Sequence, residues 1–208
     1  MKNKLWTFGD SFTFGHGCKS NLNYDYERQY PKGDAWLWPN IVSKKFNLNL
    51  VNCGYNGFSN SAILRKLTQS LSDIQKNDVV IVGKTDDFRF EIPNKNDMRQ
   101  ILVSTTMDNN PTEFYIRDYI KNIQLPYYKS LQYEIDLSLN SIHLLLTKLG
   151  VKNFIWSYSS DSKYNLDYEF SMYEKIRTAT GGEIQDDHFS WKGHSQFSNK
   201  IIEILTKL

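Results

Sequence analysis

Apolar and polar residues alternate along the chain in blocks that predict strands separated by helices. The clearest strand is Asp78–Gly83, where four apolar residues follow one another, as in a strand buried on both faces of a parallel sheet. Shorter apolar runs of strand type lie before and after it. They cover Leu5–Phe8, Leu48–Cys53 and Val151–Trp156, and a short fifth strand is expected at Gly181–Gln185. The pattern therefore predicts a sheet of about five strands, close to the usual size.

The segments between these runs carry apolar residues at helical spacing. The longest has Leu131, Ile135, Leu139, Ile142, Leu146 and Leu149 on one face and is closed by Gly150. A second is marked by Ile63, Leu64, Leu67, Leu71 and Ile74. Three more helices are expected: 35–42 with Asp34 as N-cap, 169–178, and a last one from about Ser195. Strand alternating with helix predicts an α/β fold with three α/β/α layers.

Residues 84–128 do not continue this alternation. Pro93, Pro111 and Pro126 divide the stretch, and short helices are expected at Asn96–Val103 and Thr112–Ile123. Connections of this length are uncommon unless they serve a function. We therefore expect one domain over 1–208, with 84–128 as a lid or cap insertion.

Composition limits the classes of function. The chain has 25 Lys and Arg against 23 Asp and Glu, a net charge of +2, so no strong field attracts nucleic acid or acidic lipid. No run approaches the roughly 18 apolar residues of a membrane span. Two cysteines, Cys18 and Cys53, form no disulfide-rich pattern, and Met1–Lys4 leads directly into the first strand. These features favour a cytoplasmic protein with neither a nucleic-acid nor a membrane partner.

The polar turns after the strands contain the candidate catalytic residues. Right-handed crossovers place the carboxyl ends of parallel strands at one edge, where open α/β sheets bind ligands. Turns 9–11, 54–60 and 83–86 should meet there, together with 185–194 before the last helix. They bring a serine, a histidine and carboxylates, the groups that nucleophilic catalysis requires. No zinc or nucleotide-binding pattern occurs, so neither a metal nor a cofactor is expected.

Four short motifs in these turns resemble the SGNH (GDSL-type) hydrolase family. They are Phe8-Gly9-Asp10-Ser11, Asn52-Cys53-Gly54-Tyr55-Asn56-Gly57, Gly83-Lys84-Thr85-Asp86 and Asp186-Asp187-His188. Their order is that of the family, and together they span almost the whole chain. The resemblance implies a flavodoxin-like three-layer fold, with Ser11 as nucleophile, Gly57 in the oxyanion hole and His188 as base.

The third motif departs from the family pattern. Thr85 stands where the family usually has an asparagine whose amide donates to the oxyanion. A threonine hydroxyl is a shorter donor that can rotate away, and losing one oxyanion donor costs about 10²–10³ in rate. We nevertheless place Thr85 with Ser11 and Gly57 in the expected oxyanion hole, and Lys84 is a candidate substitute for the missing amide.

The fourth motif has the spacing Asp-x-His in place of the more usual Asp-x-x-His. In an extended segment Asp186 and His188 point to the same side, which favours Asp186 as the orienting carboxylate. A helical turn would let either Asp186 or Asp187 reach the base. Gly193 and Ser195 favour a late helix start and therefore the extended geometry.

Several other polar residues have less specific interpretations. Asp10 is expected to cap the turn after Ser11, and His194 to pack at the start of the last helix. Lys84, Arg89 and Trp191 are expected substrate contacts, although Arg89 and Glu91 suit an internal salt bridge equally well.

The resemblance implies a serine ester hydrolase for small acyl esters, including acetyl groups on carbohydrate. The mechanism would use a Ser11–His188–Asp186 triad and a covalent acyl-enzyme. Two alternatives stay open: a carbohydrate O-acyltransferase with the same site, and a glycan- or partner-binding module with weak catalysis. The missing asparagine is the feature that favours the binding module.

Overall fold

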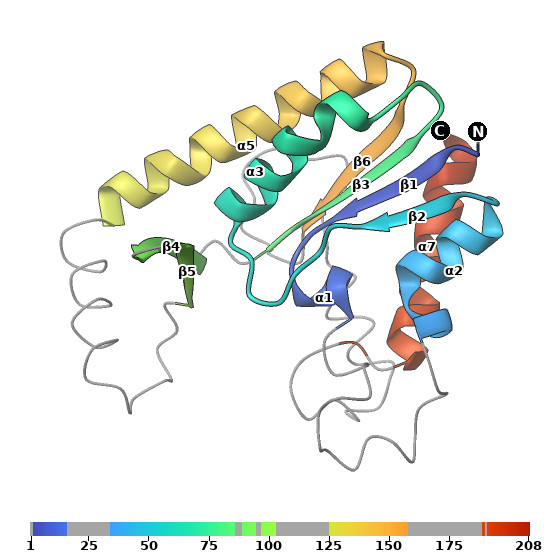
Figure 1. The fold of residues 1–208 in the computed structure, drawn as a ribbon, viewed down its shortest axis with the longest axis horizontal. Helices are drawn as coiled ribbons and strands as arrows, with labels where there is room; N and C mark the ends of the chain where they lie inside the picture. Colours follow the sequence, from blue (N-terminus) through green and yellow to red (C-terminus); the bar gives the residue numbers. More distant parts are fainter. Residues whose placement is uncertain are drawn as a thin grey trace.

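A computed structural model places four strands in one parallel sheet with helices on both faces (Figure 1). It describes residues 2–15, 34–85, 89–94, 97–102, 125–157, 189 and 191–208. The strands are β1 (Lys4–Phe8), β2 (Asn49–Asn52), β3 (Val79–Lys84) and β6 (Lys152–Ser157), in the order β2-β1-β3-β6. The predicted α/β class and parallel sheet are confirmed. The fifth predicted strand, 181–185, lies outside the described residues.

Helices α3 (Asn60–Ser70) and α5 (Leu125–Lys148) cover one face of the sheet, and α2 (Trp38–Lys45) and α7 (Trp191–Lys207) cover the other (Figure 1). Alternate residues of each strand point to opposite layers. Trp6 and Phe8 pack toward α3 and α5 with Val80 and Val82 of β3. Leu5 faces α2 and α7 on the other side. This two-sided burial explains why β3 is apolar throughout.

The boundaries of two helices differ from the predictions. Helix α2 follows a short 3-10 turn, η2 (Asp34–Trp36), and its N-cap is Leu37, without a side-chain hydrogen bond. Pro39 occupies its first turn, where the absent N–H costs nothing. Helix α7 begins at Trp191, four residues before the predicted start. Gly193 therefore lies within the first turn of α7, where glycine is tolerated.

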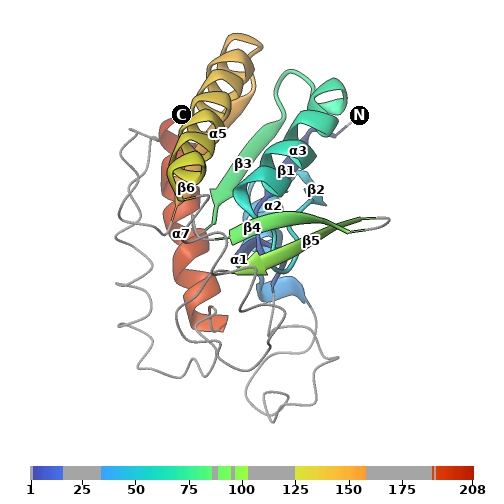
Figure 2. The ribbon, with the colours of Figure 1, turned by 90° about the vertical axis from the view of Figure 1, so that its left-hand side faces the viewer.

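The insertion 84–128 contains a β-hairpin. Strands β4 (Arg89–Asn94) and β5 (Asp97–Leu102) pair antiparallel, from Arg89 opposite Leu102 to Asn94 opposite Asp97. Figure 1 shows this hairpin apart from the main sheet, and Figure 2 shows its two strands side by side. The helix predicted at 96–103 is therefore wrong. Pairing with a neighbouring strand outweighs the weak local periodicity of this short segment. The helix predicted at 112–123 lies outside the described residues.

The other two helices show the predicted apolar spacing but different bounds: α5 begins at Leu125, inside the predicted insertion, and α3 ends at Ser70, before Leu71 and Ile74. Ser59 is the N-cap of α3, and its hydroxyl accepts from the Ala62 N–H at 3.2 Å. A short 3-10 turn, η3 (Leu71–Asp73), follows α3. Gly150 follows α5 with a φ of +75°, in the left-handed conformation predicted for a helix end. Among the described residues, no helix combines the length and hydropathy that a bilayer-spanning segment needs.

Candidate active site

The turns after β1 and β2 are joined at the carboxyl edge of the sheet. The N–H of Cys53 donates to the Thr7 carbonyl at 2.8 Å, and the N–H of Tyr55 donates to the Gly9 carbonyl at 3.1 Å. At Gly54 an added Cβ would lie 2.8 Å from the backbone nitrogen of Phe14. Only glycine allows this approach, so the turn carrying Gly57 is held against the turn carrying Ser11.

Ser11 is the first residue of a short helical turn, α1 (Ser11–Phe14). Asp10 caps this turn, as predicted, because its Oδ1 accepts from the Phe12 N–H at 3.1 Å. The backbone carbonyl of Asp10 also accepts from the N–H groups of Thr13 and Phe14, at 3.1 and 2.9 Å. Ser11 itself is 4% exposed, so the capped turn holds the serine inside the molecule.

Thr85, directly after β3, turns its hydroxyl toward this same turn. The hydroxyl donates to Asp10 Oδ2 at 2.6 Å, and both residues are buried. The side-chain amide of Asn60 holds both backbone polar groups of Thr85. Asn60 Oδ1 accepts from the Thr85 N–H at 2.8 Å, and Asn60 Nδ2 donates to the Thr85 carbonyl at 3.1 Å.

Lys84 points into the layer between the sheet and α5. Its Nζ lies 2.8 Å from Asp136 Oδ1 and 3.1 Å from Oδ2, and the Lys84 side chain is 0% exposed. Consecutive residues of a strand face opposite sides, so Lys84 and Thr85 diverge. The pairing with Asp136 does not support the predictions that Lys84 binds substrate or replaces the missing amide.

The hairpin is attached at two points, to helix α3 and to the turn after β1. Arg65 of α3 forms a two-point ion pair with Glu91, with both nitrogen–oxygen distances 2.6 Å. Arg89 Nη2 lies 3.9 Å from Asp10 Oδ2, and its side chain is 17% exposed. Arg89 and Glu91 therefore each have an ionic partner, but Arg89 faces Asp10 and Glu91 faces Arg65. Arg89 brings the insertion to the turn that carries Ser11.

Comparison with solved structures supports this reading of the fold. No protein-family model matches the sequence, and a comparison with curated proteins gives no match. The psychrotrophic esterase EstA from a Pseudoalteromonas species superposes with a TM-score of 0.52 at 11% identity, over 99% of this chain and 97% of that one. The acetyl xylan esterase Est2A from Butyrivibrio proteoclasticus also gives 0.52, at 14% identity, over 99% of this chain and 63% of that one. A lipolytic G-D-S-L family protein from Desulfitobacterium hafniense gives 0.47 at 12% identity, over 98% and 99%.

The chain shares the fold of these two esterases, EstA and Est2A, which supports the predicted SGNH-hydrolase fold. The predicted first and second motifs lead into the turns after β1 and β2, as their order in the sequence indicated. In the third motif, Gly83 and Lys84 are the last residues of β3 and Thr85 follows the strand, whereas Asp86 lies outside the described residues. Gly57 lies in the second turn with a φ of +78°, a backbone conformation that favours glycine. Its role in an oxyanion hole stays a prediction.

The fourth SGNH motif lies outside the described residues. This applies to Asp186, Asp187 and His188, so the assignment of base and orienting carboxylate stays a prediction. Trp191, an expected substrate contact, is the first residue of α7. Because α7 begins there, the late helix start that favoured an extended geometry around Asp186 is wrong.

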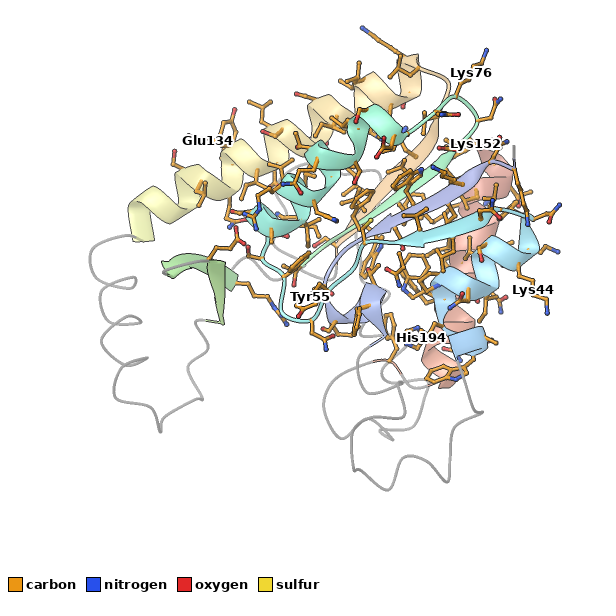
Figure 3. The ribbon with its side chains drawn as sticks, viewed as in Figure 1. Lys44, Tyr55, Lys76, Glu134, Lys152 and His194 are labelled. Carbon is orange, nitrogen blue, oxygen red and sulfur yellow. The ribbon has the colours of Figure 1, made fainter. Side chains whose placement is uncertain are left out.

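The two histidines of the described chain have structural partners. His194, labelled in Figure 3, is 1% exposed, and its Nδ1 accepts from the Trp38 N–H at 3.4 Å. The centroid of its ring lies 5.5 Å from those of Trp36 and Phe189. The predicted packing role of His194 is confirmed. His143 Nδ1 lies 2.6 Å from Asn153 Oδ1. Within the described segments, no cluster of His, Cys, Asp and Glu could hold a metal ion.

The sequence analysis missed three buried polar residues behind the third motif: Asn60, Gln132 and Asp136. Gln132 Oε1 accepts from Asn60 Nδ2 at 3.3 Å, which supports the amide that holds Thr85. One signal was present. Gln132 and Asp136 are four residues apart on the inner face of α5, beside Ile135 and Leu139, where apolar residues are the norm.

Proposed function

We propose that the chain is a serine ester hydrolase that uses Ser11 as nucleophile. The observation that carries the proposal is the position of Ser11 on a capped helical turn directly after a buried central strand. Ligands of open α/β sheets bind at this edge. The turn that bears Gly57 is joined to the Ser11 turn by backbone hydrogen bonds, which suits a shared oxyanion site.

In the proposed reaction, Ser11 Oγ attacks the acyl carbonyl while His188 accepts its proton. Asp186 holds the imidazole in the required tautomer. The N–H groups of Ser11 and Gly57 stabilise the oxyanion. His188 then protonates the leaving alcohol, and water hydrolyses the acyl-enzyme. Thr85 adds a donor only if its hydroxyl leaves Asp10, because a hydroxyl has one hydrogen.

The proposed substrate is a small acyl ester, including acetyl groups on carbohydrate. Two matches with TM-scores of 0.52 support this class: EstA is an esterase, and Est2A is an acetyl xylan esterase. Residues 84–128 would cover the site, since Arg89 lies beside Asp10. Arg89 and Trp191 are the proposed substrate contacts.

Labelling with a fluorophosphonate tests the proposal, because this probe reacts only with an activated serine. The EstA structure was obtained inhibited by monoethylphosphonate. We expect one label on Ser11, found by peptide mass, together with hydrolysis of p-nitrophenyl acetate. Absence of both would overturn the proposal and favour a binding module. Labelling with acetyl transfer to a sugar in preference to water would identify the acyltransferase.

A further inference from the structure

The contact between Thr85 and Asp10 joins two turns that are 75 positions apart in the sequence. The oxygen–oxygen distance of 2.6 Å lies in the range of a hydroxyl hydrogen bond to a carboxylate. Thr85 is 0% exposed and Asp10 is 1% exposed, so water does not compete for this bond. A hydrogen bond in such surroundings has a well-defined geometry.

Asp10 uses its two carboxylate oxygens for different turns. Oδ1 accepts from the Phe12 N–H and thereby caps the turn that begins at Ser11. Oδ2 accepts from Thr85 and lies 3.9 Å from Arg89 Nη2. Thr85, at the end of β3, therefore fixes the orientation of the Asp10 carboxylate that caps the Ser11 turn.

Thr85 is itself anchored from behind. The Asn60 side chain hydrogen-bonds to both the N–H and the carbonyl of Thr85, as the backbone of a paired strand would. The Asn60 amide in turn donates to Gln132. All three residues are buried. A chain of contacts thus runs from α5 through the start of α3 and the end of β3 to the residue before Ser11.

We infer that Thr85 is a positioning residue, which orients Asp10 and with it the turn that presents Ser11. The inference rests on the proposed function of Ser11 and replaces the predicted role of Thr85 as an oxyanion donor. The two roles exclude each other in this geometry, because the single hydroxyl hydrogen of Thr85 is donated to Asp10.

The two roles predict opposite results for Thr85→Asn, which restores the usual family residue. If Thr85 is an inferior oxyanion donor, the asparagine amide should raise kcat, by up to about 10²-fold. If Thr85 positions Asp10, the longer amide disturbs a fully buried contact, and kcat should fall below the wild-type value. Thr85→Ser keeps the hydroxyl and should retain most of the activity.

The experiment measures kcat and KM for p-nitrophenyl acetate in Thr85→Val, Thr85→Ser and Thr85→Asn. Concentrations are normalised by fluorophosphonate titration, so that a loss of folded protein does not count as a loss of rate. We expect Thr85→Val to lower kcat by about 10- to 10²-fold with little change in KM, since small misplacements of a reacting group have effects of this size. Thr68→Val, which removes an exposed hydroxyl of α3, is the matched control.

Wild-type kcat in Thr85→Val, or a higher kcat in Thr85→Asn, would overturn the inference. If Thr85→Val does not fold, Thr85→Asn still decides by the direction of its change in kcat, with Thr85→Ser as the variant that keeps the hydroxyl. An inactive, unlabelled wild type would refute the proposed function instead. In that case amide exchange tests the positioning directly: the Phe12 N–H should exchange faster in Thr85→Val, and unchanged exchange would refute it.

Discussion

Lys84 and Asp136 form an ion pair inside the protein, with 2.8 Å between Nζ and Oδ1 and side chains 0% and 4% exposed. The pair joins the end of β3, next to Thr85, to the middle of α5. Charges in such a place are stable only when they are paired, because burial removes most of their hydration.

Lys84→Met should therefore destabilise the protein strongly. Removing one partner of a buried pair leaves an uncompensated charge, which costs about 3–5 kcal/mol of the free energy of unfolding. Urea denaturation followed by circular dichroism measures this loss. The double variant Lys84→Met/Asp136→Leu should recover much of it, because no charge is left unpaired.

The exposed pair between Lys207 and Glu203 provides the control. Its nitrogen–oxygen distance is also 2.8 Å, but the side chains are 73% and 48% exposed. Lys207→Met should leave the unfolding midpoint nearly unchanged. Equal effects of Lys84→Met and Lys207→Met would show that burial does not determine the strength of these pairs.

Ser11→Ala should reduce ester hydrolysis to the background rate. Removing the nucleophile of a serine hydrolase lowers kcat by a factor on the order of 10⁶. The fold should persist, because the caps from Asp10 and the backbone hydrogen bonds of the turn do not use the Ser11 hydroxyl. Ser141→Ala on the exposed face of α5 is the control. Undiminished turnover in Ser11→Ala would exclude Ser11 as nucleophile.

Asp186→Asn should damage catalysis far more than Asp187→Asn. Loss of the carboxylate that orients the base costs roughly 10⁴ in kcat in serine-protease triads. Each variant is compared with the wild type by kcat for p-nitrophenyl acetate over a range of pH. The reverse order would assign the orienting role to Asp187, and equal, small effects would remove both aspartates from the triad.

Cys53, directly after β2, should react slowly with iodoacetamide at pH 8. Burial raises the pKa of its thiol above the usual value. The positive charge of Lys66 lowers this pKa, but by less than burial raises it. The folded protein therefore keeps the thiol proton to higher pH than the unfolded chain, and the thiolate forms only above the ordinary range. Cys18→Ser isolates this thiol. Its alkylation should accelerate in urea and with rising pH, and equal rates in the folded and unfolded protein would contradict the raised pKa.

The amino-acid sequence determined the elements whose signal is local. The apolar run of β3, the helical spacing of α3 and α5 and the cap by Asp10 follow from burial faces and from hydrogen bonds within a few residues. The order of the motifs also placed Ser11, Gly57 and Thr85 at one edge, because the carboxyl ends of parallel strands lie at the same edge of a sheet.

Only the tertiary structure decided which distant groups the buried polar side chains bind. Lys84 and Asp136 are 52 positions apart, and Thr85 and Asp10 are 75 apart, so these partners meet only when the sheet has formed. Local periodicity likewise does not identify a hairpin such as 89–102, whose stability comes from bonds across the two strands. A sequence pattern reports which face of an element is buried, whereas the direction of a buried hydroxyl or amine depends on which distant group it meets.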